Sequence, residues 1–512
     1  MNYRNAGTRA SSVAKVAGAF SILLALMAWA LASPVGASPD EDYHLTSIWC
    51  GHGLRAGVCE SGTDSANRRI SVSLLQAPCF AFRADISASC QGSGFAGPEG
   101  ELLLTDRGNF TGGYPPVFYF FNSFFVGHDI SDSVVLMRFV EAALFVLVIA
   151  ATYLASAPGL RRPIILGTAV TMVPLGMFIV PSINPSSWAM LSAATLAVSV
   201  LGYVTADDRR RRLVLGGLAA LSLLIGAGAR GDAAMYSVVA IVAALILSLG
   251  RGARRLRRSI YPLILAVIAV FVYRSTGQSG AAGGGSIDSF DIKRFARFLI
   301  DIPDLWIGAL GMRGLGWLDT TMPALVWVAA FAMFAGTLYA ALSGSSPRRC
   351  LAVGVVGLAL WFMPTYVQYL WNIPVGQGVQ PRYILPLMTL LAIIAFARID
   401  GMAFRLSAAQ RWIVVAGLSV ANAIALHTNM RRYVTGSDVT AFNLDFNREW
   451  WWGMPVGPMA VWGVGAFAFA AGLILLTREL TLTSPAERES VGVGADADQT
   501  PAGPQQDLPL IH

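Results

Sequence analysis

Charged side chains are scarce in this chain of 512 residues. They make up 13% of the chain, whereas ordinary soluble domains contain roughly a quarter. Hydrophobic residues account for 55%. A water-soluble enzyme of this length needs many more charges on its surface, so the composition excludes that class of protein.

Lysine is nearly absent, because Lys15 and Lys293 are the only two among 37 basic residues. The other basic residues are arginines, a bias typical of GC-rich bacterial genomes. The net charge of +7 is concentrated in short arginine tracts between apolar runs. Such tracts stay on the cytoplasmic side of a membrane and set the topology. We therefore expect no nucleic-acid partner.

Cysteines are few, and the chain contains no CxxC pair. Four of the five fall within residues 37–132, at Cys50, Cys59, Cys79 and Cys90. An even number in one extracytoplasmic segment predicts two disulfides, with three possible connectivities. Zinc binding with help from His44 or His52 is the alternative, and the absence of a CxxC pair disfavours it.

The chain also lacks an evident internal repeat, and most of its charges lie at the ends of apolar runs. A secondary transporter typically shows related halves and interrupted helices near the middle of the membrane. These two absences disfavour a transporter.

What the sequence does contain is a series of apolar runs, each about as long as a helix that crosses a hydrocarbon core of about 30 Å. With the arginine tracts placed inside, these runs predict an all-α polytopic membrane protein of the bacterial cytoplasmic (inner) membrane. We expect about twelve transmembrane helices, at residues 16–36, 133–156, 163–181, 187–205, 212–229, 233–249, 259–274, 322–343, 350–370, 383–398, 411–427 and 456–477.

The same topology divides the chain into five parts. Both termini are predicted to be cytoplasmic, as residues 1–15 and a polar, disordered tail at 478–512. The first helix, 16–36, is followed by a large extracytoplasmic loop at 37–132. The remaining bundle, 133–477, contains a second outer loop at 275–321. Val35 and Ala37 would also suit a signal-peptidase site, but the long apolar run favours an uncleaved anchor.

Two outer segments are predicted to lie at the membrane surface. Residues 110–127 contain eight aromatic residues in a stretch too short to span, which is typical of the membrane interface. They form either a surface that admits a lipid-linked substrate or a simple anchor. Apolar residues from Phe290 to Leu299 recur at near-helical spacing among basic ones, which predicts an amphipathic helix on the outer leaflet.

An acidic motif, Asp40-Glu41-Asp42, follows the first apolar run directly. Carboxylates at the outer mouth of a helix can act as a general base, bind a divalent cation, or do both. We take Asp40 and Glu41 as the candidate catalytic residues and His44 as a candidate substrate-binding residue. The alternative is a solvated acidic turn.

A second candidate group precedes the tenth apolar run, in the sequence QPRYILP from Gln380 to Pro386. Arg382 lies on the outer side, where the topology does not require an arginine. A guanidinium is well matched to a phosphate, which it binds through two parallel hydrogen bonds. Gln380 and Tyr383 can add donors, so all three are candidate substrate-binding residues. Snorkelling of Arg382 toward lipid headgroups is the alternative.

Other charged residues near outer helix ends have local explanations. Arg138 and Glu141 share a helix face and are expected to neutralise each other. Arg230 and Asp232 flank a tight turn and suit a local ion pair. Asp319 is expected to cap the helix that follows it.

Several short motifs together resemble a large bacterial family of polytopic membrane proteins of unassigned function. They are PDEDYH from Pro39, YPP at Tyr114, NPSSW at Asn184, GWLDT at Gly316 and QPRYILP at Gln380. The resemblance extends over about residues 16–430. That family is in turn similar to the GT-C glycosyltransferases, and the resemblance therefore implies a GT-C-like fold.

The GT-C resemblance implies a function. Such enzymes take a sugar from a polyprenyl-phosphate carrier on the outer face, and carry an acidic motif in the first outer loop, where Asp40-Glu41 stands here. The implied activity is a glycosyltransferase that acts with inversion on a cell-envelope acceptor, which is a glycan, a lipid or a protein. Some members bind a divalent cation (Mg, Mn or Ca) at this motif, so a cofactor stays open.

The arginine bias favours an actinobacterium, whose wall synthesis uses a decaprenyl-phosphate arabinose carrier. An arabinofuranosyl donor is therefore the candidate by analogy. Two other functions stay open: a flippase for lipid-linked sugars or a polymer ligase, and a non-enzymatic scaffold for wall assembly.

Overall fold

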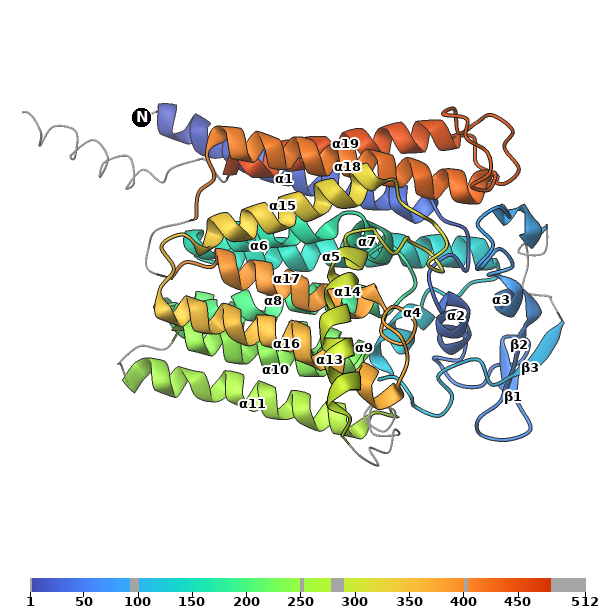
Figure 1. Cartoon of the computed structure of the whole chain (residues 1–512), viewed down its shortest axis with the longest axis horizontal. Coiled ribbons are helices and arrows are strands. Elements are labelled where there is room, and N and C mark those ends of the chain that lie inside the picture. The colour runs from blue at the N-terminus through green and yellow to red at the C-terminus, as the bar shows by residue number, and fades with distance from the viewer. Residues whose placement is uncertain (1, 93–100, 249–252, 278–289, 400–403, 480–512) are drawn as a thin grey trace, which may run out of the picture.

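The computed structural model describes residues 2–92, 101–248, 253–277, 290–399 and 404–479. Long helices run side by side, and most of the residues between the first two long helices gather at one end of them (Figure 1). We call this end of the bundle the loop end. The opposite end carries the arginine tracts, such as 209–212, and we call it the arginine end.

Within the described residues, ten helices are long and apolar enough to cross a membrane. This confirms a polytopic all-α membrane protein. The ten are α1 (Asn2–Leu31), α5 (Ile130–Ala155), α8 (Ser186–Thr205), α9 (Arg209–Ala229), α10 (Gly231–Ser248), α11 (Ala253–Ser275), α15 (Ala324–Leu342), α16 (Pro347–Trp371), α18 (Ala408–Val434) and α19 (Pro458–Glu479).

The predicted span 163–181 is not one helix but two, α6 (Pro158–Met172) and α7 (Leu175–Ile179). The break falls at Val173 and Pro174. Proline has no backbone N–H to continue the helical hydrogen bonds, and the residue before a proline avoids the helical conformation. Val173 accordingly has extended backbone angles, with φ −96° and ψ 131°.

The predicted span 383–398 is the helix α17 (Pro381–Phe396), which has only 16 residues. At a rise of about 1.5 Å per residue it is about 24 Å long, shorter than a hydrocarbon core of about 30 Å. The helix is buried on all sides, in contact with α6, α8 and α16. α17 therefore runs through the centre of the bundle (Figure 1).

The loop end is a folded region rather than an irregular loop. A small antiparallel sheet has the order β1 (Cys59–Ser61), β2 (Arg68–Ser71), β3 (Leu102–Thr105). Short helices surround it, namely α2 (Glu41–Trp49), α3 (Val72–Gln76), η1 (Ala88–Gln91) and α4 (Val117–Ser123). The two predicted disulfides are confirmed, with the connectivity Cys50–Cys59 and Cys79–Cys90.

The predicted amphipathic segment is also a helix, α13 (Ile292–Asp301), and α14 (Pro303–Ala309) follows it. The side chain of Asp291 caps α13 by accepting hydrogen bonds from the backbone of Lys293 and Arg294. Ile292 and Ile300 are exposed, as expected for a helix that rests on a membrane surface. The predicted tail, 478–512, lies almost wholly outside the described residues.

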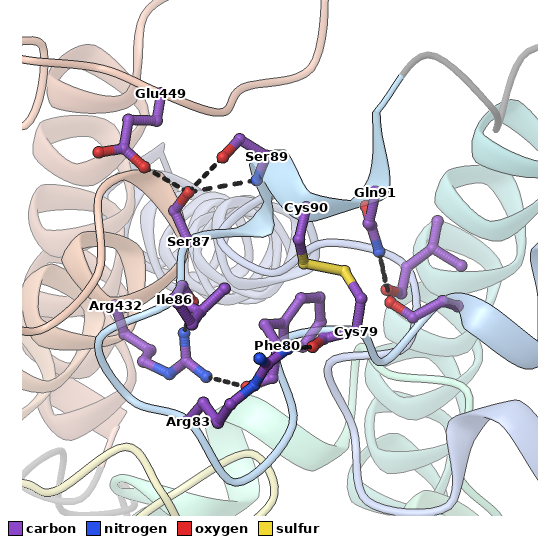
Figure 2. The surroundings of a disulfide bond; sticks show 12 residues. Cys79, Phe80, Arg83, Ile86, Ser87, Ser89, Cys90, Gln91, Arg432 and Glu449 are labelled. Carbon is purple, nitrogen blue, oxygen red and sulfur yellow. Dashed lines mark hydrogen bonds between the residues drawn. A yellow bond between two sulfur atoms is a disulfide. The ribbon is translucent and has the colours of Figure 1, made fainter.

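The Cys79–Cys90 disulfide closes a loop that holds the end of α18 (Figure 2). Arg432 of α18 donates hydrogen bonds to the carbonyl oxygens of Phe80 (2.8 Å) and Ile86 (2.6 Å). Its guanidinium also binds the carboxylate of Asp319 at 2.8 Å. The prediction that Asp319 caps a helix is therefore wrong: Pro323 precedes α15, and Asp319 compensates the buried charge of Arg432.

The double substitution Cys79→Ser with Cys90→Ser should destabilise the protein. It frees the loop that binds Arg432, and opening a loop of this length costs about 2–4 kcal/mol of unfolding free energy. Thermal unfolding of the purified protein measures the effect. Cys350→Ser is the matched control, because Cys350 is a free, exposed thiol. Equal stability of the two variants would contradict this account.

Candidate functional site

Side chains from other helices form hydrogen bonds to the turn that leads from α1 into α2. Arg138 of α5 donates hydrogen bonds to the carbonyl oxygens of Ala30 (3.0 Å), in the last turn of α1, and Pro34 (2.7 Å), just after it. Asn184, just before α8, donates to the carbonyl oxygen of Pro39 at 2.9 Å. The backbone on both sides of Asp40 is therefore fixed by other helices.

Glu41 completes this arrangement as the ion-pair partner of Arg138. The two side chains lie 2.9 Å apart and are 0% and 1% exposed. The second oxygen of Glu41 accepts a hydrogen bond from the backbone of Ser38 at 2.9 Å. Because both oxygens are occupied and buried, the geometry does not support the predicted catalytic role of Glu41. It gives Glu41 a positioning role instead.

The expected pairing of Arg138 with Glu141 is wrong. Glu141 is buried and accepts hydrogen bonds from Asn122 (2.9 Å), Trp188 (2.8 Å) and Ser187 (3.3 Å). These residues belong to α4 and α8, so Glu141 joins three helices. The one-turn spacing on α5 suggested a local pair, but each residue faces a different set of partners.

Asp40 is the partly exposed carboxylate of the acidic motif. It precedes α2 with φ 60° and ψ 19°, a left-handed conformation that aspartate tolerates better than most residues. One oxygen accepts a hydrogen bond from Arg382 at 2.6 Å, and the other accepts one from Arg107 at 3.1 Å. Two predicted site residues that lie 342 positions apart are thus in direct contact.

Arg107 is a site residue that the sequence did not reveal. It binds both oxygens of Asp42, at 2.8 Å and 3.0 Å, and its guanidinium lies 5.6 Å from the ring centre of Tyr43. Arg107 stands in a polar segment between β3 and α4, where neither hydrophobic periodicity nor a motif distinguishes it. Arg107 therefore bridges the carboxylates of Asp40 and Asp42.

The charges around Asp40 control its protonation. Burial opposes ionisation of this carboxyl, but the guanidinium groups of Arg382 and Arg107 outweigh burial and hold its pKa below the usual value. His44 behaves differently, because its complete burial lowers its pKa to about 3. His44 is therefore neutral near pH 7, and its Nδ1 lies 3.0 Å from the hydroxyl of Tyr119.

Arg382 is placed by the first turn of α17, at the centre of the loop end. Its side chain is 3% exposed and also donates to the hydroxyl of Tyr383 at 3.0 Å. Its Nε and Nη1 have no hydrogen-bond partner among the described residues. Gln380 immediately precedes α17, and its Oε1 likewise has no partner in the described part of the chain.

A cavity of about 520 Å³ lies beside this cluster. Tyr383 and Tyr114 line it, as does the ion pair between Arg230 and Asp232, whose atoms lie 2.6 Å apart. That local pair is confirmed. Arg230 is also buried against the ring of Tyr383, at 4.4 Å from its centre. Sequence reasoning underrated Arg230, because the cavity forms only when four distant segments meet.

The acidic motif does not offer a separate place for a divalent cation. Asp40 and Asp42 both bind guanidinium groups, and Glu41 is turned toward Arg138. In the described part of the chain, no group of three or more histidine, cysteine, aspartate or glutamate side chains is arranged to hold a metal ion. The sequence left a divalent cation at this motif open, and the arrangement of the donors does not favour one.

Comparison with known proteins gives one match. The model of a family of predicted membrane proteins, DUF2142, matches residues 23–391. The chain belongs to the DUF2142 family. A search of curated proteins found no match, and neither did a search of solved structures. The segment matched by DUF2142 includes Asp40, Arg107 and Arg382, so the whole charged cluster lies within the family's region.

Removing Arg138 should severely destabilise this DUF2142 protein. In Arg138→Ala, the carboxylate of Glu41 stays buried without a counter-charge, which costs about 3–5 kcal/mol of unfolding free energy. The double variant Arg138→Met with Glu41→Gln leaves no uncompensated charge and should lose much less. Thermal unfolding of the three purified proteins measures the difference, and a double variant as unstable as Arg138→Ala would contradict the pairing.

Proposed function

We propose that this DUF2142 protein is a GT-C-like glycosyltransferase that moves a sugar from a polyprenyl-phosphate donor to a cell-envelope acceptor. The loop end faces outward from the bacterial cytoplasmic membrane in this proposal, and both termini are cytoplasmic. The observation that carries the proposal is the contact between Asp40 and Arg382. It joins a partly exposed carboxylate to a buried cation suited to phosphate.

The donor phosphate binds at Arg382 in this proposal. Leaving the buried Nε and Nη1 atoms without acceptors costs about 1–3 kcal/mol for each group, and phosphate oxygens would supply those acceptors. Arg230 packs against the same ring of Tyr383 as Arg382 does, and its own charge is compensated by Asp232. The cavity beside them, lined by tyrosines and apolar residues, receives the sugar and the first part of the lipid.

Asp40 is the general base. Its depressed pKa makes it a weak base in the structure as it stands. A phosphate diester bound at Arg382 brings a negative charge close to Asp40 and offsets that arginine. The pKa of Asp40 then rises toward a more useful range, so donor binding itself prepares the base.

The reaction follows from these two positions. Asp40 takes the proton from an acceptor hydroxyl, whose oxygen attacks the anomeric carbon opposite the phosphate. The new glycosidic bond forms as the bond between that carbon and the phosphate oxygen breaks, and the configuration inverts. The polyprenyl phosphate leaves with an added negative charge, which Arg382 stabilises in a site of low dielectric. An arabinofuranosyl group is our candidate sugar, and the acceptor is a glycan, a lipid or a protein.

Release of free polyprenyl phosphate tests this function, because it needs no knowledge of the product. The purified protein in membrane vesicles is given labelled polyprenyl-phosphate sugars, including decaprenyl-phosphate arabinose, with cell-envelope extract as acceptor. Asp40→Asn should slow release by about 10²–10⁴-fold, since it removes the base. Arg382→Gln should weaken donor binding as well as release.

Asp64→Asn and Arg297→Gln are the matched controls, because both side chains are exposed and distant from the cluster in sequence. Full activity of Asp40→Asn would overturn the transferase proposal. Movement of the lipid-linked sugar across the vesicle membrane without release would indicate a flippase instead.

The dependence of release on pH should change when Arg107 is removed. Arg107 helps to keep the pKa of Asp40 low, so the base stays ionised as the pH falls below the usual range of an aspartate. In Arg107→Gln the pKa of Asp40 rises, and the loss of activity at acid pH should therefore begin at a higher pH. An unchanged acid limb would show that Asp40 does not control the rate.

A further inference from the structure

A second cavity, of about 490 Å³, lies at the loop end and is separate from the one beside Arg382. Tyr119 lines the second cavity, whereas Tyr114 lines the first. His44 contacts both tyrosines, since its ring lies 5.7 Å from that of Tyr114 and its Nδ1 lies 3.0 Å from the hydroxyl of Tyr119. The rings of Tyr114 and Tyr119 are also in contact, so the linings of the two cavities adjoin each other.

The second cavity combines aromatic rings with polar groups. Phe120 and Leu54 at its edge are 50% and 59% exposed, although both side chains are apolar. The guanidinium of Arg68 lies 5.4 Å from the ring centre of Phe110. Asn109, which directly precedes Phe110, also lines the cavity. The amide of Asn109 is itself held by the backbone of Tyr114. An exposed aromatic ring beside a guanidinium suits a ligand with apolar C–H faces and many hydroxyls, namely a saccharide.

The cavity has a fixed shape and a size typical of ligand sites. The disulfide between Cys50 and Cys59 forms part of its lining, so the end of α2 and the start of β1 cannot move apart. Ligand pockets in proteins commonly enclose about 300–1,000 Å³. Arg68 supplies the only charge in the lining, which favours a neutral or weakly acidic ligand.

The helix α2 connects this cavity to Asp40. Ser47 lines the cavity, and Tyr43 lies four residues before it and three residues after Asp40, the spacing of neighbours on one helix face. Tyr43 is also the one residue of α2 that is not buried. Seven residues of helix span about 10 Å. Asn109 binds Ser47 at 2.8 Å, and Arg107 covers the ring of Tyr43 and binds Asp40, so the segment that lines the cavity also contacts the carboxylate.

We propose that the second cavity binds the saccharide of the acceptor and aligns its terminal hydroxyl with Asp40. The role of the saccharide as an acceptor rests on the proposed function. Its binding in the cavity does not. The acceptor is then a carbohydrate chain or a glycolipid rather than an unmodified protein.

Direct binding tests the inference. Saturation-transfer NMR with the full chain in lipid nanodiscs, using arabinotriose, mannotriose and chitotriose as probes, should detect binding of at least one trisaccharide. Arg68→Gln should weaken that binding about tenfold, the loss expected when one good contact is removed. Arg69→Gln should not, because neighbouring residues of a strand point to opposite faces and Arg69 does not line the cavity.

A second pair of variants keeps the test independent of Arg68. Phe120→Ala should weaken binding, whereas Phe82→Ala should not, since Phe82 is an even more exposed aromatic residue of the same region outside the cavity. No binding of any probe, or equal losses within either pair, would overturn the inference.

The outcomes also separate the two proposals. If polyprenyl phosphate is released in a manner that requires Asp40 while no trisaccharide binds, only the saccharide site is refuted. If a trisaccharide binds as described and no donor is ever turned over, the saccharide site stands and the transferase proposal fails.

Discussion

The ion pair between Glu41 and Arg138 is the constraint on which the arrangement of the site depends. Both charges are buried, so neither can be lost without leaving the other uncompensated. The same arginine completes the hydrogen bonding at the end of α1, and the same glutamate begins α2. One interaction therefore fixes the direction in which the chain leaves the membrane bundle, and with it the position of Asp40 immediately before.

Around that fixed turn, the charged residues with a structural role are buried, whereas the candidate reactive carboxylate is partly exposed. Glu41 and Glu141 are buried together with their hydrogen-bond partners, and Asp42 forms an ion pair with Arg107. Within the acidic motif, only Asp40 combines partial exposure with a contact to a buried arginine. The short central helix α17 makes this contact possible, because its first turn presents Arg382 from within the bundle rather than from the surface.

The sequence was sufficient for the features that depend on local patterns. Apolar runs predicted where the long helices lie, except that the span 163–181 is broken into α6 and α7. The cysteine count predicted the two disulfides. Asp40 and Arg382 were identified because their charges were not needed for topology. The interaction partners of the charged residues were not predicted correctly: Arg138 was paired with the residue one turn away, and Arg107 was overlooked. A pattern along one helix cannot reveal which of several distant segments packs against it, and tertiary contacts decide such pairings.

The wide separation of Asp40 and Arg382 along the chain has a consequence for biosynthesis. A nascent chain that has emerged through α16 already carries Asp40 and Arg107, but lacks the arginine that contacts the carboxylate and the α18 residues that bind the loop from Cys79 to Cys90. Such long-range contacts form late, after the intervening segments have been made. The charged cluster is thus absent from every product that ends before α17, and it assembles only after this late helix has been made.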